Sequence, residues 1–228
     1  MKTLFIALLL APILIFGQSN SNTETKENLS NDVLWVTQSL EYSTLCRQIY
    51  SSASHMIFNK LKTNQSPVII MDLDETVLDN SQYQIELFLK DREYDEKSWN
   101  NWVKKEVADL VPGSKEFILS FKKHENAKII FLSNRSESTL SATKNNMKKL
   151  GIYFDDDIFL LRKNKNDTKI IRRKEVYEGI NRMKKHGPQF VIAYFGDAMG
   201  DFPKSKNDKG FSINKFIFPN PMYGKWRN

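Results

Sequence analysis

Acidic side chains occur in two short clusters, each directly after an apolar run that is typical of a buried strand. Asp72 and Asp74 follow the run VIIM, and Asp197 and Asp201 follow the run FVIAYF. Several carboxylates in one place would repel one another unless a cation lay among them. Because carboxylate oxygens are ligands that Mg²⁺ prefers, the spacing predicts a metal site with Mg²⁺ as the expected cofactor.

A hydroxyl and a group of amines follow two further apolar runs. Ser133 comes after KIIFL, and Lys163, Lys165 and Lys169 come after IFLL. A hydroxyl and an ammonium beside metal-bound carboxylates form a cradle for phosphate, which is typical of phosphoryl transfer. Each cluster alone also fits a structural role, since Asp, Ser and Thr cap helices and begin turns. Their repetition after four buried runs favours a functional site.

The elements that would position these residues alternate along the chain. β-Branched apolar runs predict buried parallel strands, and the segments between them have helical spacing, so we expect an α/β fold with a mostly parallel sheet flanked by helices. Ligands of such sheets bind beyond the carboxyl ends of the strands, where the clusters lie. Strands are expected near residues 68–71, 128–132, 158–161, 190–195 and 216–218, and helices over 31–61 (one long or two shorter), 114–124, 136–150 and 169–186.

The chain divides into four parts by composition. Residues 1–17 have a basic start and an apolar stretch, which predicts a cleaved signal peptide. An uncleaved membrane anchor is the alternative, but a run of 13 residues that contains Pro12 is short for a span of about 20. Residues 18–30 are expected to be a flexible tether, and residues 31–228 the folded domain. Within it, the polar segment at about 80–111 predicts a small, mainly helical cap, and the 31–61 helix is a candidate to pack beside it.

Composition narrows the class of protein. The chain has 228 residues, 12% of them aromatic, and a single cysteine, Cys46, which excludes a disulfide-framed miniprotein and disfavours disorder. The chain has a net charge of +7, and the positive excess is concentrated in residues 144–185, which contain thirteen Lys or Arg against six Asp or Glu. Such a stretch fits small anionic ligands, a nucleic acid or a solvated helix face.

Three motifs resemble those of a known family. They are MDLDETVLDNSQY at 71–83, FLSNR at 131–135 and FGDAMGDF at 195–202, with VPGSKEF at 111–117 and PNPMYGKW at 219–226 in further agreement. The chain resembles the bacterial class C non-specific acid phosphatases, the DDDD group of the haloacid dehalogenase (HAD) superfamily. The resemblance covers nearly the whole exported chain and implies a HAD-like, Rossmannoid fold.

The resemblance implies a role for each motif residue. Asp72 is expected to be the nucleophile that forms an aspartyl-phosphate, and Asp74 to be the acid and then the base. Mg²⁺ is expected on the Asp72 carboxylate, the Asp74 carbonyl and Asp197. Ser133 and a lysine are expected to bind phosphate, with Lys169 preferred over Lys165 and Lys163. Asp201 is expected to orient that lysine or a metal-bound water.

The chain departs from the family pattern in three places. Ala198 replaces a common Asn, Ser133 replaces the usual Thr, and no cysteine is available for a lipid anchor, so a periplasmic or secreted bacterial protein without a stable membrane anchor is expected. Trp99, Trp102 and Tyr223 resemble an aromatic box that stacks a nucleobase. Packing of the cap against the sheet is the alternative role for the tryptophans.

Together, these features predict an exported Mg²⁺-dependent acid phosphatase that acts on small phosphomonoesters, including nucleoside monophosphates. A phosphotransferase or a narrow-specificity nucleotidase of the same superfamily is one alternative. A protein that binds nucleic acid or an anionic surface through residues 144–185 is an alternative of another class, although no nucleic-acid polymer is expected as a partner of the enzyme. A homodimer is compatible with the sequence.

Overall fold

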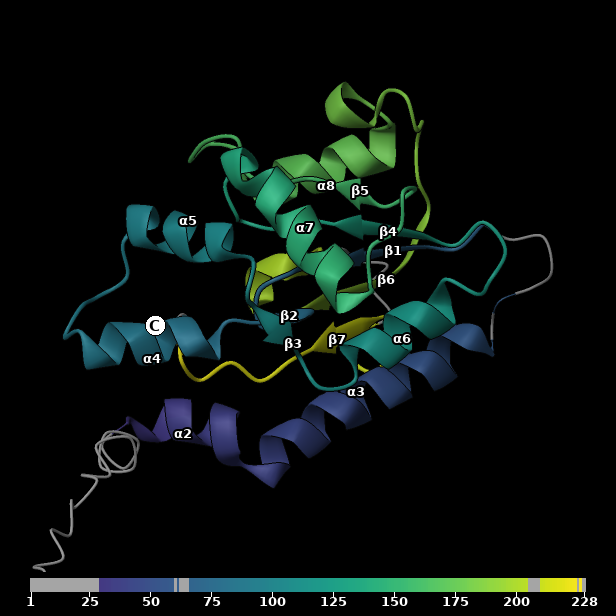
Figure 1. Cartoon of the computed structure of the whole chain (residues 1–228). Helices are drawn as coiled ribbons and strands as arrows, with labels where there is room; N and C mark the ends of the chain where they lie inside the picture. Colours follow the sequence, from purple (N-terminus) through teal and green to yellow (C-terminus); the bar gives the residue numbers. More distant parts are fainter. Residues whose placement is uncertain (1–28, 60, 62–65, 205–209, 225, 227–228) are drawn as a thin grey trace, which may run out of the picture.

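A five-stranded, all-parallel sheet forms the centre of the protein (Figure 1). The computed structural model describes residues 29–59, 61, 66–204, 210–224 and 226, so the predicted signal peptide and nearly all of the predicted tether lie outside the described residues. The strands follow the order β5-β4-β1-β6-β7. Their bounds are β1 Val68–Met71, β4 Lys128–Phe131, β5 Ile158–Phe159, β6 Val191–Gly196 and β7 Lys215–Ile217.

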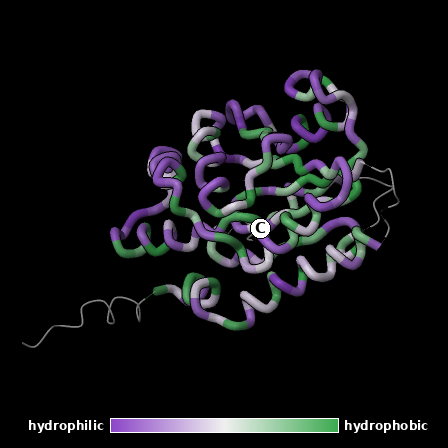
Figure 2. The backbone as a smooth tube through the Cα atoms, turned by 45° about the vertical axis from the view of Figure 1, so that its right-hand side comes forward, coloured by the Kyte–Doolittle hydropathy of each residue, from purple (hydrophilic) through white to green (hydrophobic). Residues whose placement is uncertain are grey.

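The central strand β1 is buried on both faces, which explains its uninterrupted apolar sequence. Successive side chains of a strand point to opposite faces of the sheet. Val68 and Ile70 accordingly join one hydrophobic cluster, and Ile69 and Met71 join the other. Figure 2, in which the chain is coloured by the hydropathy of its residues, shows hydrophobic segments gathered in this centre and hydrophilic segments around it. Each face of the sheet therefore has its own layer of helices.

Two sets of helices cover the two faces. The cluster that contains Ile69 includes Tyr50, Phe117 and Met147, from three helices on one face. The cluster that contains Ile70 includes Val176 from the other face. The helices of the first face are α3 Leu40–Phe58, α6 Ser114–Phe121 and α7 Leu140–Leu150. Those of the second face are α8 Lys169–Glu178 and the short 3₁₀ helix η2 Asn181–Met183, whereas a further 3₁₀ helix, η3 Met199–Asp201, follows β6.

The helical stretch predicted over residues 31–61 is two helices, one of the two arrangements expected. Helix α2 covers Asn31–Gln38 and α3 begins at Leu40. Between them Ser39 has an extended backbone, and its hydroxyl accepts a hydrogen bond from the Tyr42 N–H at 3.0 Å. A serine in this position satisfies an unpaired N–H at the start of a helix. The break therefore comes from a capping residue inside the apolar pattern.

The helix predicted over residues 169–186 was too long. Helix α8 ends at Glu178, and Gly179 follows in the left-handed conformation with φ 66°. A Cβ atom at Gly179 would lie 2.4 Å from backbone atoms of Gly187 and Pro188, so the chain approaches itself closely there. Glycine at this position both ends the helix and permits the return of the chain. Residues 181–183 then form η2.

The segment after β1 contains a small two-stranded sheet and two helices. Strand β2 Leu78–Asp79 pairs with β3 Asp109–Leu110 in antiparallel orientation, and α4 Ser81–Leu89 and α5 Glu96–Lys105 lie between them. Helix α4 packs against α2, and α5 packs against α7. This antiparallel pair was absent from the sequence prediction, because two-residue strands leave no alternating pattern.

Among the helices of the described ranges, none combines the length and the apolar character that a membrane crossing needs.

Candidate active site

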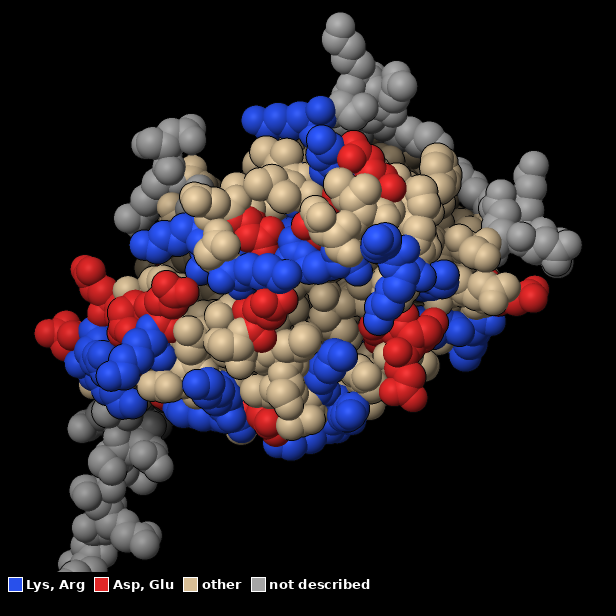
Figure 3. All heavy atoms as spheres, turned by 90° about the horizontal axis from the view of Figure 1, so that it is seen from above, with Lys and Arg blue, Asp and Glu red and all other residues tan. Residues whose placement is uncertain are grey.

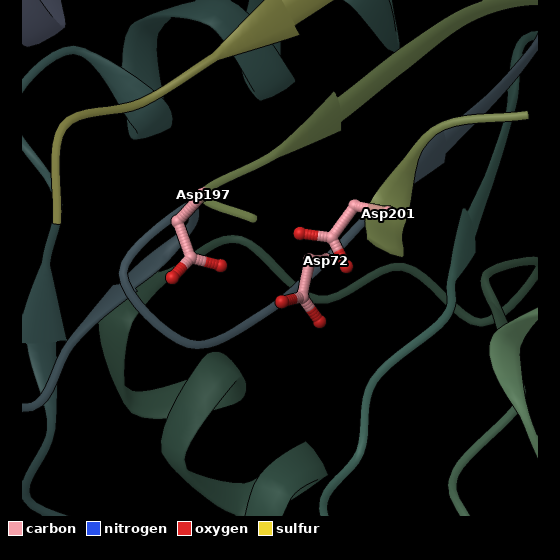
Figure 4. A group of neighbouring side chains, drawn as sticks. All are labelled: Asp72, Asp197 and Asp201. Atoms are coloured by element: carbon pink, nitrogen blue, oxygen red, sulfur yellow. The ribbon is translucent and has the colours of Figure 1, made fainter. Parts of the chain in front are cut away.

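Three carboxylates meet beyond the carboxyl ends of the central strands. Asp72 follows β1, Asp197 follows β6, and Asp201 ends η3. One oxygen from each lies within 4.8 Å of the others, and Figure 4 shows the three side chains directed into a common space. The convergence follows from the parallel pairing of β1 with β6, in which the Asp72 N–H donates to the Phe195 carbonyl at 2.9 Å. Three of the four acidic side chains singled out in the sequence, those of Asp72, Asp197 and Asp201, therefore come together.

Lys169 lies between two of these carboxylates. It is the first residue of α8, and its ammonium lies 2.7 Å from Asp72 Oδ1 and 2.5 Å from Asp201 Oδ1. Burial lowers the pKa of Lys169, but the charges of Asp72 and Asp201 raise it more, so the net pKa lies above its ordinary value. Lys163 and Lys165 are exposed. Lys169 is thus the lysine of the three that the fold buries within the cluster.

Burial and like charges act together on Asp72. Burial raises the pKa of Asp72 well above its ordinary value, the Lys169 ammonium opposes this, and Asp201 and Asp197 raise it again. A carboxylate in this position needs further positive charge to remain ionised. The oxygen donors and their mutual repulsion fit a divalent cation. Asp201 is the least suited ligand, since its oxygens already accept from Lys169 and from the Ala198 N–H at 2.9 Å.

Gly196 at the end of β6 makes room for Asp201. A Cβ atom at Gly196 would lie 2.3 Å from Asp201 Cβ and 2.5 Å from its Oδ2. Contacts this short cannot be accommodated without displacing the aspartate. The donor to Asp201 from residue 198 is a backbone N–H, so Ala198 supplies this hydrogen bond as well as an asparagine would.

Asp74 lies in a separate set of polar contacts that joins the β1 and β4 loops. Its Oδ1 accepts from Arg135 Nε at 2.8 Å and from Asn80 Nδ2 at 3.0 Å. Ser133, which follows β4, places its hydroxyl 3.4 Å from Asp74 Oδ2, and the same hydroxyl accepts from the Arg135 N–H at 3.1 Å. The structure therefore brings Ser133 next to Asp74, as the position of both loops at one sheet edge implies.

The tryptophans of α5 are built into this polar cluster. Trp102 is 2% exposed, and its Nε1 donates to Asn80 Oδ1 at 2.9 Å. Trp99 is 8% exposed, packs edge-on to Tyr83 and lies 5.9 Å below the Arg135 guanidinium. These contacts fit the packing alternative for both rings, and the substrate-stacking role stays a prediction.

The loop between Asp74 and β2 contains a buried glutamate in an unusual conformation. Glu75 has φ 56° and is 1% exposed, and its Oε1 accepts from the Asn80 N–H at 2.9 Å. Its Oε2 accepts from the hydroxyl of Tyr223, near the end of the chain. Burial raises the pKa of Glu75 well above its ordinary value, Asp74 raises it further, and the Tyr223 hydroxyl opposes the shift. Tyr223 is thus in contact with the acidic loop through its hydroxyl.

Comparison with known proteins places this geometry in a family. Residues 15–226 match the model of the HAD superfamily, subfamily IIIB (acid phosphatase). The chain belongs to this family of acid phosphatases. The resemblance and the HAD-like α/β fold predicted from the motifs are therefore confirmed.

Solved structures similar to this subfamily IIIB chain agree with the assignment. Two structures of the class C acid phosphatase from Bacillus anthracis, one of them with tungstate bound, are each 28% identical to it. Each comparison covers 84% of this chain and 83% of the other, with a TM-score of 0.69. The stem 31 kDa glycoprotein of Glycine max is 26% identical over 166 residues, or 71% of this chain. The chain spans 61% of the length of that relative.

Two arginines of α8 hold the loops of this acid phosphatase family site in place. Arg172 is fully buried, and its guanidinium donates to the Ser133 carbonyl at 2.5 Å and to Asn134 Oδ1 at 2.6 Å. Arg173 donates to the Gly200 carbonyl at 3.0 Å and so fixes η3. Burial lowers the pKa of Arg172 to about 10. These residues belong to the basic stretch, and they act inside the fold.

Other charges of the basic stretch are paired with acidic side chains. Arg182 binds Glu175 at 2.7 Å and Asp167 at 2.9 Å, and Lys149 binds Glu106 at 2.8 Å. Figure 3 shows Lys and Arg interleaved with Asp and Glu across the face seen from above. Local pairing and the buried arginines therefore account for part of the excess charge without a polyanionic partner.

Four polar residues of the site were missed as functional candidates from the sequence. Arg135, Asn80 and Glu75 lie within the quoted motifs, and Arg172 lies three residues after Lys169, but no role was assigned to them. Their partners are up to 148 residues away in the chain, as for Glu75 and Tyr223. The available signal was a concentration of polar residues in short loops between fully apolar strands, where each must find a partner.

Proposed function

We propose that this chain is a Mg²⁺-dependent acid phosphatase that hydrolyses phosphomonoesters through an aspartyl-phosphate at Asp72. The observation that carries the proposal is that the Asp72 carboxylate lies 2.7 Å from the Lys169 ammonium and in one cluster with Asp197 and Asp201. Membership of an acid phosphatase subfamily and similarity to a structure with bound tungstate, an oxyanion like phosphate, support it.

The proposed reaction has two displacements at phosphorus. In the first, an oxygen of Asp72 forms a bond to phosphorus while the bond to the leaving oxygen breaks, and Asp74 gives that oxygen its proton. In the second, Asp74 takes a proton from water, the water oxygen bonds to phosphorus, and the bond from phosphorus to Asp72 breaks. Splitting the hydrolysis in this way replaces one difficult step with two easier ones.

The remaining residues bind and neutralise the phosphoryl group. Lys169 offsets the negative charge of Asp72 and of phosphate, and Asp201 holds its ammonium in place. The Ser133 hydroxyl is close enough to Asp74 to donate to a phosphoryl oxygen beside it. Mg²⁺ would be held by Asp72, Asp197 and the Asp74 carbonyl, and when bound it supplies positive charge against the phosphoryl oxygens.

Hydrolysis of p-nitrophenyl phosphate tests the proposal directly. Activity is expected to be highest at acidic pH, as membership of an acid phosphatase subfamily implies. EDTA is expected to abolish activity and added Mg²⁺ to restore it. Asp72→Asn should lose at least about a thousandfold in kcat, since no nucleophile remains. Full turnover by that variant would contradict the assignment of Asp72.

Nucleoside monophosphates are the proposed substrates among phosphomonoesters. The resemblance of Trp99, Trp102 and Tyr223 to an aromatic box supports this choice, because stacking accepts every base. Trp99→Ala is then expected to raise KM for adenosine monophosphate several-fold more than KM for ethyl phosphate. Equal changes in the two KM values would show that the buried ring serves only to pack α5.

Export is the proposed location of this activity. The apolar run over residues 4–16, with a lysine before it and a polar stretch after it, supports a cleaved signal peptide. Expression of the full chain in a bacterial host should place the shortened protein in the periplasm or the medium. N-terminal sequencing that finds Met1 on the mature protein would contradict the proposal.

A further inference from the structure

The segment after β7 contacts both acidic loops of the site. Phe218 continues the pairing with β6, since its N–H donates to the Gly196 carbonyl at 2.9 Å. Two residues on, Asn220 Nδ2 donates to Asp197 Oδ2 at 2.6 Å. Tyr223 then donates its hydroxyl to Glu75. The C-terminal motif PNPMYGKW therefore forms hydrogen bonds with the loops after β1 and after β6.

Glu75 is the residue through which the C-terminal segment contacts the loop that contains Asp74. A left-handed backbone is unfavourable for a residue with a side chain, so the surrounding contacts must hold Glu75 in it. Both carboxylate oxygens have donors, one from the Asn80 N–H and one from the Tyr223 hydroxyl. The second donor comes from outside the loop, so the conformation of the loop depends on the C-terminal segment.

Asn80 extends the connection to Asp74. Its N–H donates to Glu75 Oε1 at 2.9 Å, and its side-chain Nδ2 donates to Asp74 Oδ1 at 3.0 Å. Asn80 is fully buried, so its amide has little freedom to turn away. A continuous series of hydrogen bonds thus leads from the hydroxyl of Tyr223 through Glu75 and Asn80 to the carboxyl group of Asp74.

We propose that the Tyr223 hydroxyl is a positioning group that, through Glu75 and Asn80, holds Asp74 in place for proton transfer. The inference rests on the proposed acid and base role of Asp74. It assigns the effect of Tyr223 to its hydroxyl, whereas the aromatic-box resemblance assigns it to the ring. The two roles predict opposite dependence on the leaving group.

Loss of the hydroxyl leaves Glu75 Oε2 buried without this donor, and the strained loop then loses one of its supports. A displaced Asp74 protonates the leaving oxygen less effectively. This matters most for a poor leaving group such as an alkoxide and least for p-nitrophenolate, which needs little help from an acid. A stacking ring would instead matter most for aromatic substrates and least for alkyl phosphates.

The test compares wild type and Tyr223→Phe on ethyl phosphate, p-nitrophenyl phosphate and adenosine monophosphate, with Mg²⁺ present. Tyr223→Phe is expected to lower kcat/KM for ethyl phosphate about tenfold, and that for p-nitrophenyl phosphate by a smaller factor, because a misplaced acid slows poor leaving groups most. Tyr177→Phe is the matched control. It removes a hydroxyl that binds Tyr194 at 2.8 Å and is not part of the series of hydrogen bonds from Tyr223 to Asp74, so it should leave the leaving-group dependence unchanged.

Glu75→Gln provides a second, independent variant. A glutamine has one acceptor oxygen for the two donors that now bind Glu75, so it should show the same leaving-group pattern as Tyr223→Phe. If both residues act through one contact, adding Tyr223→Phe to Glu75→Gln should cost much less than it costs the wild type. This coupling does not depend on the absolute activity of either variant.

Two results would overturn the inference. One is a Tyr223→Phe protein with wild-type kcat/KM on ethyl phosphate. The other is a loss confined to adenosine monophosphate, which would show that the hydroxyl contributes to nucleotide binding and not to the position of Asp74. Both require an active wild-type protein. Absence of hydrolysis by the wild-type protein on all three substrates would instead overturn the proposed function, and this inference with it.

Discussion

Replacement of Gly196 by alanine should displace Asp201 and disconnect it from Lys169. The added methyl carbon would lie 2.3 Å from Asp201 Cβ and 2.7 Å from its Cγ, and these atoms cannot remain there. Overpacking of a tight site costs about 1–3 kcal/mol. A strained or broken hydrogen bond between charged groups, here that of Lys169 to Asp201 at 2.5 Å, costs about 1.5–3 kcal/mol. We expect a loss of about 3 kcal/mol in the free energy of unfolding.

Two assays measure the effect. A loss of this size corresponds to a Tm lowered by about 6–12 °C for a chain of this length. Because Lys169 moves relative to Asp72, kcat should fall about a hundredfold, as expected for a catalytic group misplaced by about 1 Å. Gly200→Ala is the matched control, since a Cβ at Gly200 meets nothing within 4 Å, and its Tm and kcat should stay near those of the wild type.

A third variant tests whether Asp201 is the cause. Asp201→Gly removes the atoms that the new methyl group would meet, so Gly196→Ala should cost much less in that background. The reasoning is refuted if Gly196→Ala has the Tm and kcat of Gly200→Ala. It is also refuted if the cost of Gly196→Ala is the same with and without the Asp201 side chain.

Two further predictions concern charged groups. Lys169→Met should lower kcat at least about a hundredfold, because it removes the positive charge that is proposed to bind phosphate. Lys165→Met should leave kcat unchanged. Similar activities of the two variants would contradict the choice of lysine. Burial raises the pKa of Asp157 to about 6, against the Phe154 N–H and the Lys122 ammonium. The stability that this shift contributes, at most about 3 kcal/mol, is complete below about pH 4 and lost as the pH rises through about 6. Asp157→Asn should flatten this part of the stability profile, as chemical denaturation at several pH values can measure.

The sheet and the acidic cluster were predictable because each depends on a local pattern. The run VIIM is apolar at every position because both faces of β1 are covered. A continuous apolar run of this kind is typical of a buried parallel strand. Asp72 and Asp197 then meet because parallel strands end at one edge, which the order of elements already implies. The prediction needed no knowledge of which helix covers which face.

The second set of contacts could not be predicted in the same way. Glu75 binds Tyr223, and Arg135 binds Asp74, across loops whose relative positions depend on the whole fold. Such pairs have no periodic spacing, so the sequence identifies the polar residues but not their partners. The end of α8 is a different case. Gly179 is a stop signal that the sequence shows, but the residues after it continue the helical spacing, so the predicted helix extended too far.

The central claim is that Asp72 accepts the phosphoryl group. Rapid acid quenching of the Mg²⁺-loaded protein during turnover of p-nitrophenyl phosphate, followed by mass spectrometry of its peptides, tests this most directly. We predict one phosphoryl group on the peptide that contains Asp72, at a level that rises before the steady state, and none in Asp72→Asn. Steady turnover with no phosphoryl group on that peptide at any quench time, together with an active Asp72→Asn protein, would contradict the claim.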